Sequence, residues 1–257
     1  MSTIPRLDIE GLPIHIRLHR SASTIVYRRV PCVAAVSNGV KDALAADLTP
    51  FVGNDRLVVV PNPIHADEIR RLAKPNTERS RRLRFCSVGR LVAAKGIDVL
   101  IEAFSIANLG SAWELLLVGD GPMRPTLERL VRQRRLGEHV HFLGTVENPY
   151  PTMASADVAV QASLWEGFGM AILEALCLGI PQIATSCPGG VSDTLGNGKY
   201  GILVPPGDPD ELAGALNAVA DSPALRQELA VRGLERVKEY APARVAEIVT
   251  QLATAIG

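Results

Sequence analysis

The sequence predicts an α/β protein built on a doubly wound parallel sheet. Short apolar runs alternate with helical patterns, and each run is continuously apolar rather than alternating between apolar and polar residues. This combination is typical of a parallel sheet that helices cover on both faces. The strands expected after the first 80 residues are "RFCSV", "ELLLV", "HVHFL", "DVAVQ", "PQIAT" and "GILVP".

The helices expected between these strands show a 3.6-residue periodicity. Their apolar faces consist of Ile97, Leu100, Ile101 and Phe104 in the first helix and of Leu127, Leu130 and Val131 in the second. The tail is predicted to be helical throughout, with a last apolar stripe between Val245 and Ile256.

This pattern divides the chain into three unequal parts. Residues 76–240 are predicted to form the complete doubly wound domain, and residues 1–75 a partial α/β segment with two strands, "CVAAV" and "RLVVV". Two strands are too few for an independent domain of this type, so we expect a part of the N-terminal side to be missing. Residues 241–257 are expected to form a helix that packs back on the N-terminal segment.

Composition excludes several classes of protein. The 257 residues include 27 Lys and Arg and 27 Asp and Glu, which is no electrostatic footprint for nucleic acid. No apolar run approaches the roughly 20 residues of a membrane span. Four cysteines without a C-x-x-C pair indicate reduced thiols and a cytoplasmic protein.

The segment 70–84 departs from this charge balance, because it holds seven Lys or Arg residues and one Glu. Two interpretations stay open: a solvated linker between domains, or a peripheral contact with anionic lipid head groups at the inner face of the membrane.

Three expected strand ends are polar and rich in glycine, and ligands of such sheets bind at the carboxyl ends of strands. Gly167 and Gly169 precede a helix, whose free N–H groups favour an anion. Arg90 and Lys95 follow another strand end, and together they suit a diphosphate. The alternative of a dinucleotide site is weakened because Arg124 occupies the third glycine position of its motif.

Two carboxylates flank this anion site. Glu166 lies in the loop and Glu174 within the helix, roughly 10 Å apart by helix rise. Carboxylates accept hydrogen bonds from vicinal hydroxyls, so one could hold a ribose and the other a hexose. This arrangement indicates a nucleotide sugar. The alternative for Glu174 is a structural ion pair with a neighbouring helix.

The segments "SVGRLVAAKG", "LLLVGDGP", "HFLGTV", "LWEGFGMAILEALCLGIPQIAT" and "YGILVPPGD" follow one another in this order. From about residue 84 onward, the chain therefore resembles the C-terminal, donor-binding, Rossmann-like domain of the family-four retaining glycosyltransferases (group 1 type, GT-B fold). Residues 32–64 resemble the last part of that family's N-terminal domain.

The resemblance implies roles for the matched positions. Glu166 would contact hydroxyls of the donor sugar, and Glu174 would contact the ribose. Arg90 and Lys95 would stabilise the diphosphate leaving group in place of a metal ion, so we expect neither a metal nor another cofactor. The loop backbone would hold the distal phosphate through Gly167, Phe168, Gly169 and Met170.

The implied reaction moves a hexose or N-acetylhexosamine from a UDP-linked donor to a glycan or lipid-linked acceptor with retention of configuration. Departures from the family pattern are Ala162, where proline is usual, and Asp193, where glutamate is common. The family's N-terminal glycine-rich loop and histidine find no match, and His15 and His19 do not align with that histidine. The alternative is therefore a non-catalytic nucleotide-sugar-binding module that needs a separate chain, or that self-associates.

Overall fold

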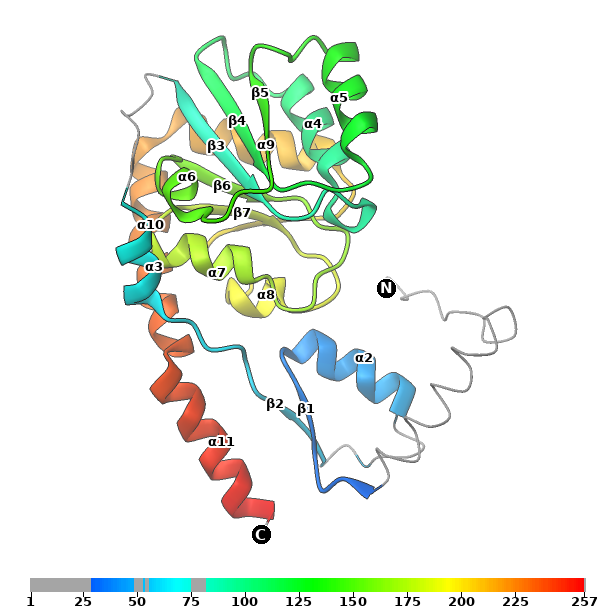
Figure 1. The fold of residues 1–257 in the computed structure, drawn as a ribbon, viewed down its shortest axis with the longest axis vertical. Coiled ribbons are helices and arrows are strands. Elements are labelled where there is room, and N and C mark those ends of the chain that lie inside the picture. Colours follow the sequence, from blue (N-terminus) through cyan, green and yellow to red (C-terminus); the bar gives the residue numbers. More distant parts are fainter. Residues whose placement is uncertain (1–28, 49–52, 54–55, 75–81, 257) are drawn as a thin grey trace, which may run out of the picture.

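The computed structural model describes residues 29–48, 53, 56–74 and 82–256. Its main unit is a six-stranded, entirely parallel sheet with the strand order β5-β4-β3-β6-β7-β8 (Figure 1). The strands are β3 (Leu83–Val88), β4 (Trp113–Val118), β5 (Val140–Gly144), β6 (Val158–Gln161), β7 (Gln182–Thr185) and β8 (Ile202–Val204). Every residue of β6 and β7 is buried, as expected for strands covered on both faces. The predicted doubly wound fold is confirmed.

Helices cover both faces of this sheet. One face packs against α4 (Ile97–Ile106), α5 (Arg124–Gln133) and α9 (Pro209–Asp221), with Phe85 and Leu115 in the shared core. The other face packs against α6 (Tyr150–Ala154), α7 (Met170–Cys177) and α8 (Val191–Thr194). The helix α10 (Pro223–Val237) lies against α7, where Gly233 allows close contact with Leu176.

The N-terminal segment forms a second, smaller unit. A two-stranded parallel sheet joins β1 (Val33–Ala35) to β2 (Leu57–Val59), and α2 (Asn38–Leu48) connects the two strands. The chain passes between the units twice, after β2 and again at η4 (Lys238–Tyr240) before α11 (Pro242–Ile256) (Figure 1). One backbone hydrogen bond, from Ile64 N to Tyr240 O at 2.9 Å, joins the two crossings.

The helix α3 (Ala66–Leu72) packs against the six-stranded unit, although it precedes residue 75, the end of the predicted N-terminal segment. Ile69 is buried in the same core as residues of α7, and Arg70 Nε donates to Cys177 O at 2.9 Å. Packing therefore assigns α3 to the six-stranded unit, because its apolar face needs a partner that the two-stranded sheet does not provide. The domain division itself stays a prediction. Residues 1–28 and 75–81 lie outside the described residues, and they include His15, His19 and the centre of the basic segment.

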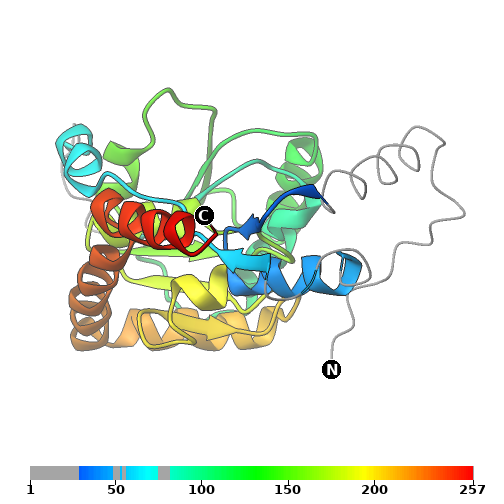
Figure 2. The same cartoon turned by 90° about the horizontal axis from the view of Figure 1, so that it is seen from below.

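The last helix, α11, extends beside the N-terminal unit, and Figure 2 shows α11, the two strands and α2 side by side from below. A groove of about 470 Å³ lies between them, lined by Val36 and Val59 on one side and by Arg244 and Ile248 on the other. The predicted packing of residues 241–257 on the N-terminal segment stays a prediction. Within the described residues, no helix combines the length and apolarity that a membrane crossing requires.

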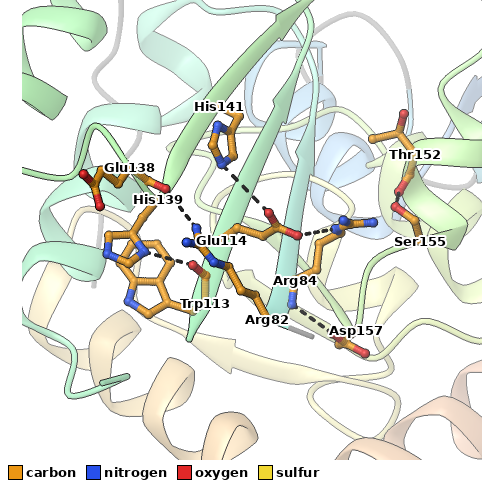
Figure 3. A network of polar contacts seen from close by, with 10 residues as sticks. All are labelled: Arg82, Arg84, Trp113, Glu114, Glu138, His139, His141, Thr152, Ser155 and Asp157. Carbon is orange, nitrogen blue, oxygen red and sulfur yellow. Dashed lines mark hydrogen bonds and ion pairs between the residues drawn. The ribbon is translucent and has the colours of Figure 1, made fainter. Parts of the chain in front are cut away.

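A polar network holds the amino ends of the strands together (Figure 3). Arg84 Nε of β3 donates to Glu114 Oε1 of β4 at 2.7 Å, and these side chains are only 14% and 13% exposed. Asp157 accepts a hydrogen bond from Arg84 N at 2.8 Å, and His141 Nε2 lies 3.9 Å from Glu114 Oε2. This network lies where the strands begin, at the opposite end of the sheet from the glycine-rich loops that follow the strands.

We predict that Glu114→Ala lowers the free energy of unfolding by about 3–5 kcal/mol, because it leaves the Arg84 guanidinium buried without its carboxylate. Urea denaturation followed by circular dichroism measures this loss. The double variant Arg84→Met/Glu114→Leu, which leaves neither member of the pair, should lose clearly less. Equal losses in the single and double variants would contradict this assignment of the energy to the ion pair.

Candidate nucleotide-sugar site

The carboxyl ends of β3 and β6 meet at one cavity of about 520 Å³. Adjacent parallel strands place the loops that follow them side by side, and β3 pairs directly with β6. Seven of the eight predicted site residues line this cavity: Arg90, Lys95, Glu166, Gly167, Phe168, Gly169 and Met170. Glu174, the eighth, is not among its lining residues.

Backbone hydrogen bonds join the loops that surround the cavity. Leu164 N donates to Ala94 O at 2.8 Å, which joins the loop after β6 to the 3₁₀ turn η3 (Ala93–Lys95) after β3. Leu91 N donates to Asp120 O at 2.9 Å, which adds the loop after β4. The positions of Arg90 and Lys95 are therefore set by neighbouring loops as well as by their own strand.

Lys95 and Glu166 form an ion pair within the cavity, and each side chain is 21% exposed. Ser163 Oγ donates a second hydrogen bond to Glu166 Oε2 at 3.3 Å. Arg90, by contrast, is exposed, and its side chain makes no hydrogen bond or ion pair with any described residue. The cavity thus contains one cation free for a ligand and a second cation that already has a carboxylate partner.

The start of α7 supplies further positive character. Gly169 is its N-cap with a left-handed φ of 88°, and no side chain caps this end. The backbone N–H groups of Phe168, Gly169, Met170 and Ala171 donate to no acceptor in the described part of the chain. Free N–H groups at the positive end of a helix dipole favour an anion.

The loop that carries these groups is fixed from behind. Thr194 Oγ1 donates to Phe168 O at 3.0 Å, and the Phe168 ring packs edge-to-face on Tyr240 with centroids 5.6 Å apart. Ser37 Oγ of the N-terminal segment donates to Gly167 O at 3.2 Å. The loop 166–169 before α7 is therefore held in place by both units of the structure.

Glu174 lies beside the cavity, within α7 and close to α6. Burial raises the pKa of its carboxyl, and the hydroxyl of Tyr150, 3.5 Å away, partly offsets that increase. Burial, followed by the nearby Glu174 carboxylate, also raises the pKa of Tyr150. No Lys or Arg among the described residues pairs with Glu174, so the structure does not support the alternative of an ion pair with a neighbouring helix.

Two residues that sequence reasoning missed, Val36 and Asn62, also line the cavity. Both belong to the N-terminal segment. The carboxyl end of β2 gave a signal for Asn62, because the rule that ligands bind beyond strand ends applies to "VVVPNPI" as well. Gln161, at the end of β6, lines the cavity too, but its Nε2 already donates to Val88 O at 3.1 Å.

The polar groups of the glycine-rich loop after β4 already bond to one another. Asp120 accepts hydrogen bonds from Gly121 N and from Arg124 Nη1, at 2.7 and 2.9 Å, and both lower its pKa. Arg124 also pairs with Glu128 at 2.9 Å. This arrangement gives no support to the dinucleotide alternative. In the part of the chain that the structure describes, no three His, Cys, Asp or Glu side chains cluster as metal ligands.

Comparison with known proteins gives a consistent result. The model of the family described as "Glycosyl transferases group 1" matches residues 68–236. Alpha-D-kanosaminyltransferase of Streptomyces kanamyceticus is 35% identical over 146 residues, which cover 56% of this chain and 38% of that protein. Lipopolysaccharide 1,6-galactosyltransferase of Salmonella typhimurium is 30% identical over 191 residues, which cover 72% of this chain and 51% of that protein. The chain thus spans about half, or less, of the length of these curated relatives.

Among solved structures, Anabaena HepE in complex with UDP superposes with a TM-score of 0.82 at 21% sequence identity. The superposition covers 97% of this chain and 70% of HepE. At this identity the likeness shows the fold, and it includes the N-terminal unit.

We predict that Glu174→Gln stabilises the ligand-free protein above neutral pH. A carboxyl whose pKa is raised by folding favours the protonated state, so its contribution to stability falls as pH rises from the unfolded pKa through the folded one. The neutral amide avoids that loss. Thermal unfolding at pH 8 and at pH 4 measures the effect, and the gain should shrink at pH 4, where Glu174 is protonated. A destabilised variant at pH 8 would instead indicate a structural ion pair.

Proposed function

This chain belongs to the group 1 glycosyl transferases, and we propose that it binds a nucleotide sugar for transfer of the sugar to a glycan or lipid-linked acceptor. The observation that carries the proposal is the single cavity that brings Arg90, Lys95 and Glu166 to the free amino end of α7. A UDP-linked hexose or N-acetylhexosamine is the proposed donor. HepE, whose structure contains UDP, supports the choice of UDP.

Each residue binds the part of the donor that suits its charge and its hydrogen-bonding groups. Arg90 and Lys95 stabilise the diphosphate, whose negative charge grows as the glycosidic bond breaks. The N–H groups from Phe168 to Met170 hold the distal phosphate, and Glu166 accepts hydrogen bonds from sugar hydroxyls. Glu174, beside the cavity, receives the ribose. Transfer with retention of configuration, as in the family-four enzymes, completes the proposal.

A second candidate function is a donor-binding module that transfers nothing by itself. It is favoured by the small size of the described N-terminal unit, which gives the cavity Val36 and Asn62 from a two-stranded sheet. The lipid contact of residues 70–84 and the cytoplasmic location stay predictions. Four of the basic residues in that segment already bond within the protein: Arg70, Arg71, Arg82 and Arg84.

We predict that the protein binds UDP in the presence of EDTA, because Arg90, Lys95 and the α7 amides supply the positive charge that a metal ion would otherwise supply. Calorimetry with UDP and GDP tests this. Arg90→Met and Lys95→Met should each weaken binding about tenfold to a hundredfold, as for a lost charge-assisted hydrogen bond. The control Arg129→Met removes the same charge from the exposed face of α5 and should bind as the wild type does. Binding that strictly requires Mg²⁺ or Mn²⁺ would contradict the prediction.

We predict that the purified 257-residue chain transfers little or no sugar. Fixing an acceptor against the anomeric carbon and excluding water can supply roughly 7–11 kcal/mol of the barrier. That task needs a facing wall larger than two strands. The measurement is UDP release from a panel of UDP-sugars, with and without lipid extract as acceptor. Robust acceptor-dependent turnover would show that the N-terminal unit suffices and would exclude the donor-binding module.

A further inference from the structure

The short segment after β2 contributes Asn62 to the lining of the cavity that also includes the start of α7. Asn62 lines the cavity together with Gly89, Arg90 and the first residues of α7, more than 25 positions along the chain. Asn62 is half-buried, and its side-chain amide makes no hydrogen bond to any described residue. It is therefore a polar group that is partly removed from water and still without a partner in the described part of the chain.

The backbone on both sides of Asn62 is held firmly. Pro61 and Pro63 flank it, so φ is fixed at both neighbours, and a residue before proline is restricted to extended conformations. Val60 N donates to Ala35 O at 2.8 Å just before this segment, and Ile64 N donates to Tyr240 O at 2.9 Å just after it. Asn62 is thus presented to the cavity by a rigid segment, which lowers the entropy lost when its side chain binds a ligand.

Most other polar side chains of the cavity already have a hydrogen-bond or ion-pair partner within the protein. Lys95 and Glu166 pair with each other, and Gln161 donates its amide hydrogen to Val88 O. Arg90 is the charged group without a partner among the described residues, and Asn62 is the neutral one. An amide NH₂ can donate to a phosphate oxygen and has no charge that would repel it.

The position within the cavity indicates which part of a donor Asn62 would meet. The cavity includes the free amino end of α7, the proposed site of the distal phosphate, and Glu166, the proposed partner of the sugar. It does not include Glu174, the proposed partner of the ribose. Asn62 therefore shares its cavity with the proposed site of the distal phosphate and not with the proposed partner of the ribose.

We propose that Asn62 donates a hydrogen bond to the distal phosphate of the bound nucleotide, so that the N-terminal unit takes part in donor binding. This inference rests on the proposed function. In this role Asn62 is a binding residue supplied across the boundary between the two units, and occupancy of the site joins them through the ligand. Ser37, which bonds to Gly167 O, already joins the same two units without a ligand.

The test compares UDP with UMP, which lacks the distal phosphate, by calorimetry in EDTA. Asn62→Ala should weaken UDP binding about tenfold, the effect of one lost hydrogen bond to a charged group, and should leave UMP binding nearly unchanged. Asn62→Asp places a negative charge beside the phosphate and should weaken UDP binding about a hundredfold. The ratio of the two affinities is the readout, since a misfolded variant would lose UDP and UMP alike.

A matched control is Asn108→Asp, which adds the same charge to an exposed loop before β4. This loop lies at the amino ends of the strands, at the opposite end of the sheet from the cavity. This variant should bind UDP as the wild type does. Wild-type affinity for UDP in both Asn62 variants would overturn the inference and leave the proposed function standing. Equal losses for UDP and UMP would also overturn it. A wild-type protein that binds neither UDP nor GDP would overturn the proposed function, and this inference with it.

Discussion

The close approach of three backbone segments is the constraint on which the site depends. A Cβ atom on Gly189 would lie 1.5 Å from the carbonyl oxygen of Glu166, and one on Gly39 would lie 2.1 Å from the carbonyl oxygen of Gly189. Only glycine permits either contact. The stack joins α2 of the N-terminal unit, the loop after β7 and the loop 166–169 before α7. Glu166 N donates to Pro188 O at 3.1 Å, which adds a direct hydrogen bond to the same stack.

A second anchor acts on the same loop from the side of α10. The Arg236 guanidinium donates through Nε to Thr194 O at 3.0 Å and through Nη2 to the Tyr240 hydroxyl at 2.8 Å. It also lies over the Tyr240 ring, 5.0 Å from the centroid. Tyr240 in turn packs on Phe168. One arginine, whose side chain is 14% exposed, therefore fixes the residues that hold the loop 166–169, so this loop is supported on both sides.

Much of the fold and most of the site could be predicted because both follow from local patterns. Continuous apolar runs identify buried strands, and the strand-end rule then gathers Arg90, Lys95 and the loop from Glu166 to Met170. The pairing of Lys95 with Glu166 could not be predicted, because the two residues are 71 positions apart and meet only when β3 lies beside β6. For the same reason the contact of α3 with α7 could not be predicted, because it joins residues about 100 positions apart.

The Lys95–Glu166 pair gives the proposed chemistry a definite starting state. The ammonium group is held by a carboxylate inside the same cavity that contains the proposed site of the diphosphate. Binding a donor places the phosphate and the sugar hydroxyls in competition for the same two side chains. As the glycosidic bond breaks, negative charge accumulates on the diphosphate, while the sugar becomes positive. The attraction of Lys95 for the diphosphate and that of Glu166 for the sugar then increase together. Preorganised charges of opposite sign, both near the reacting bond, stabilise such a separation of charge more than they stabilise the intact donor.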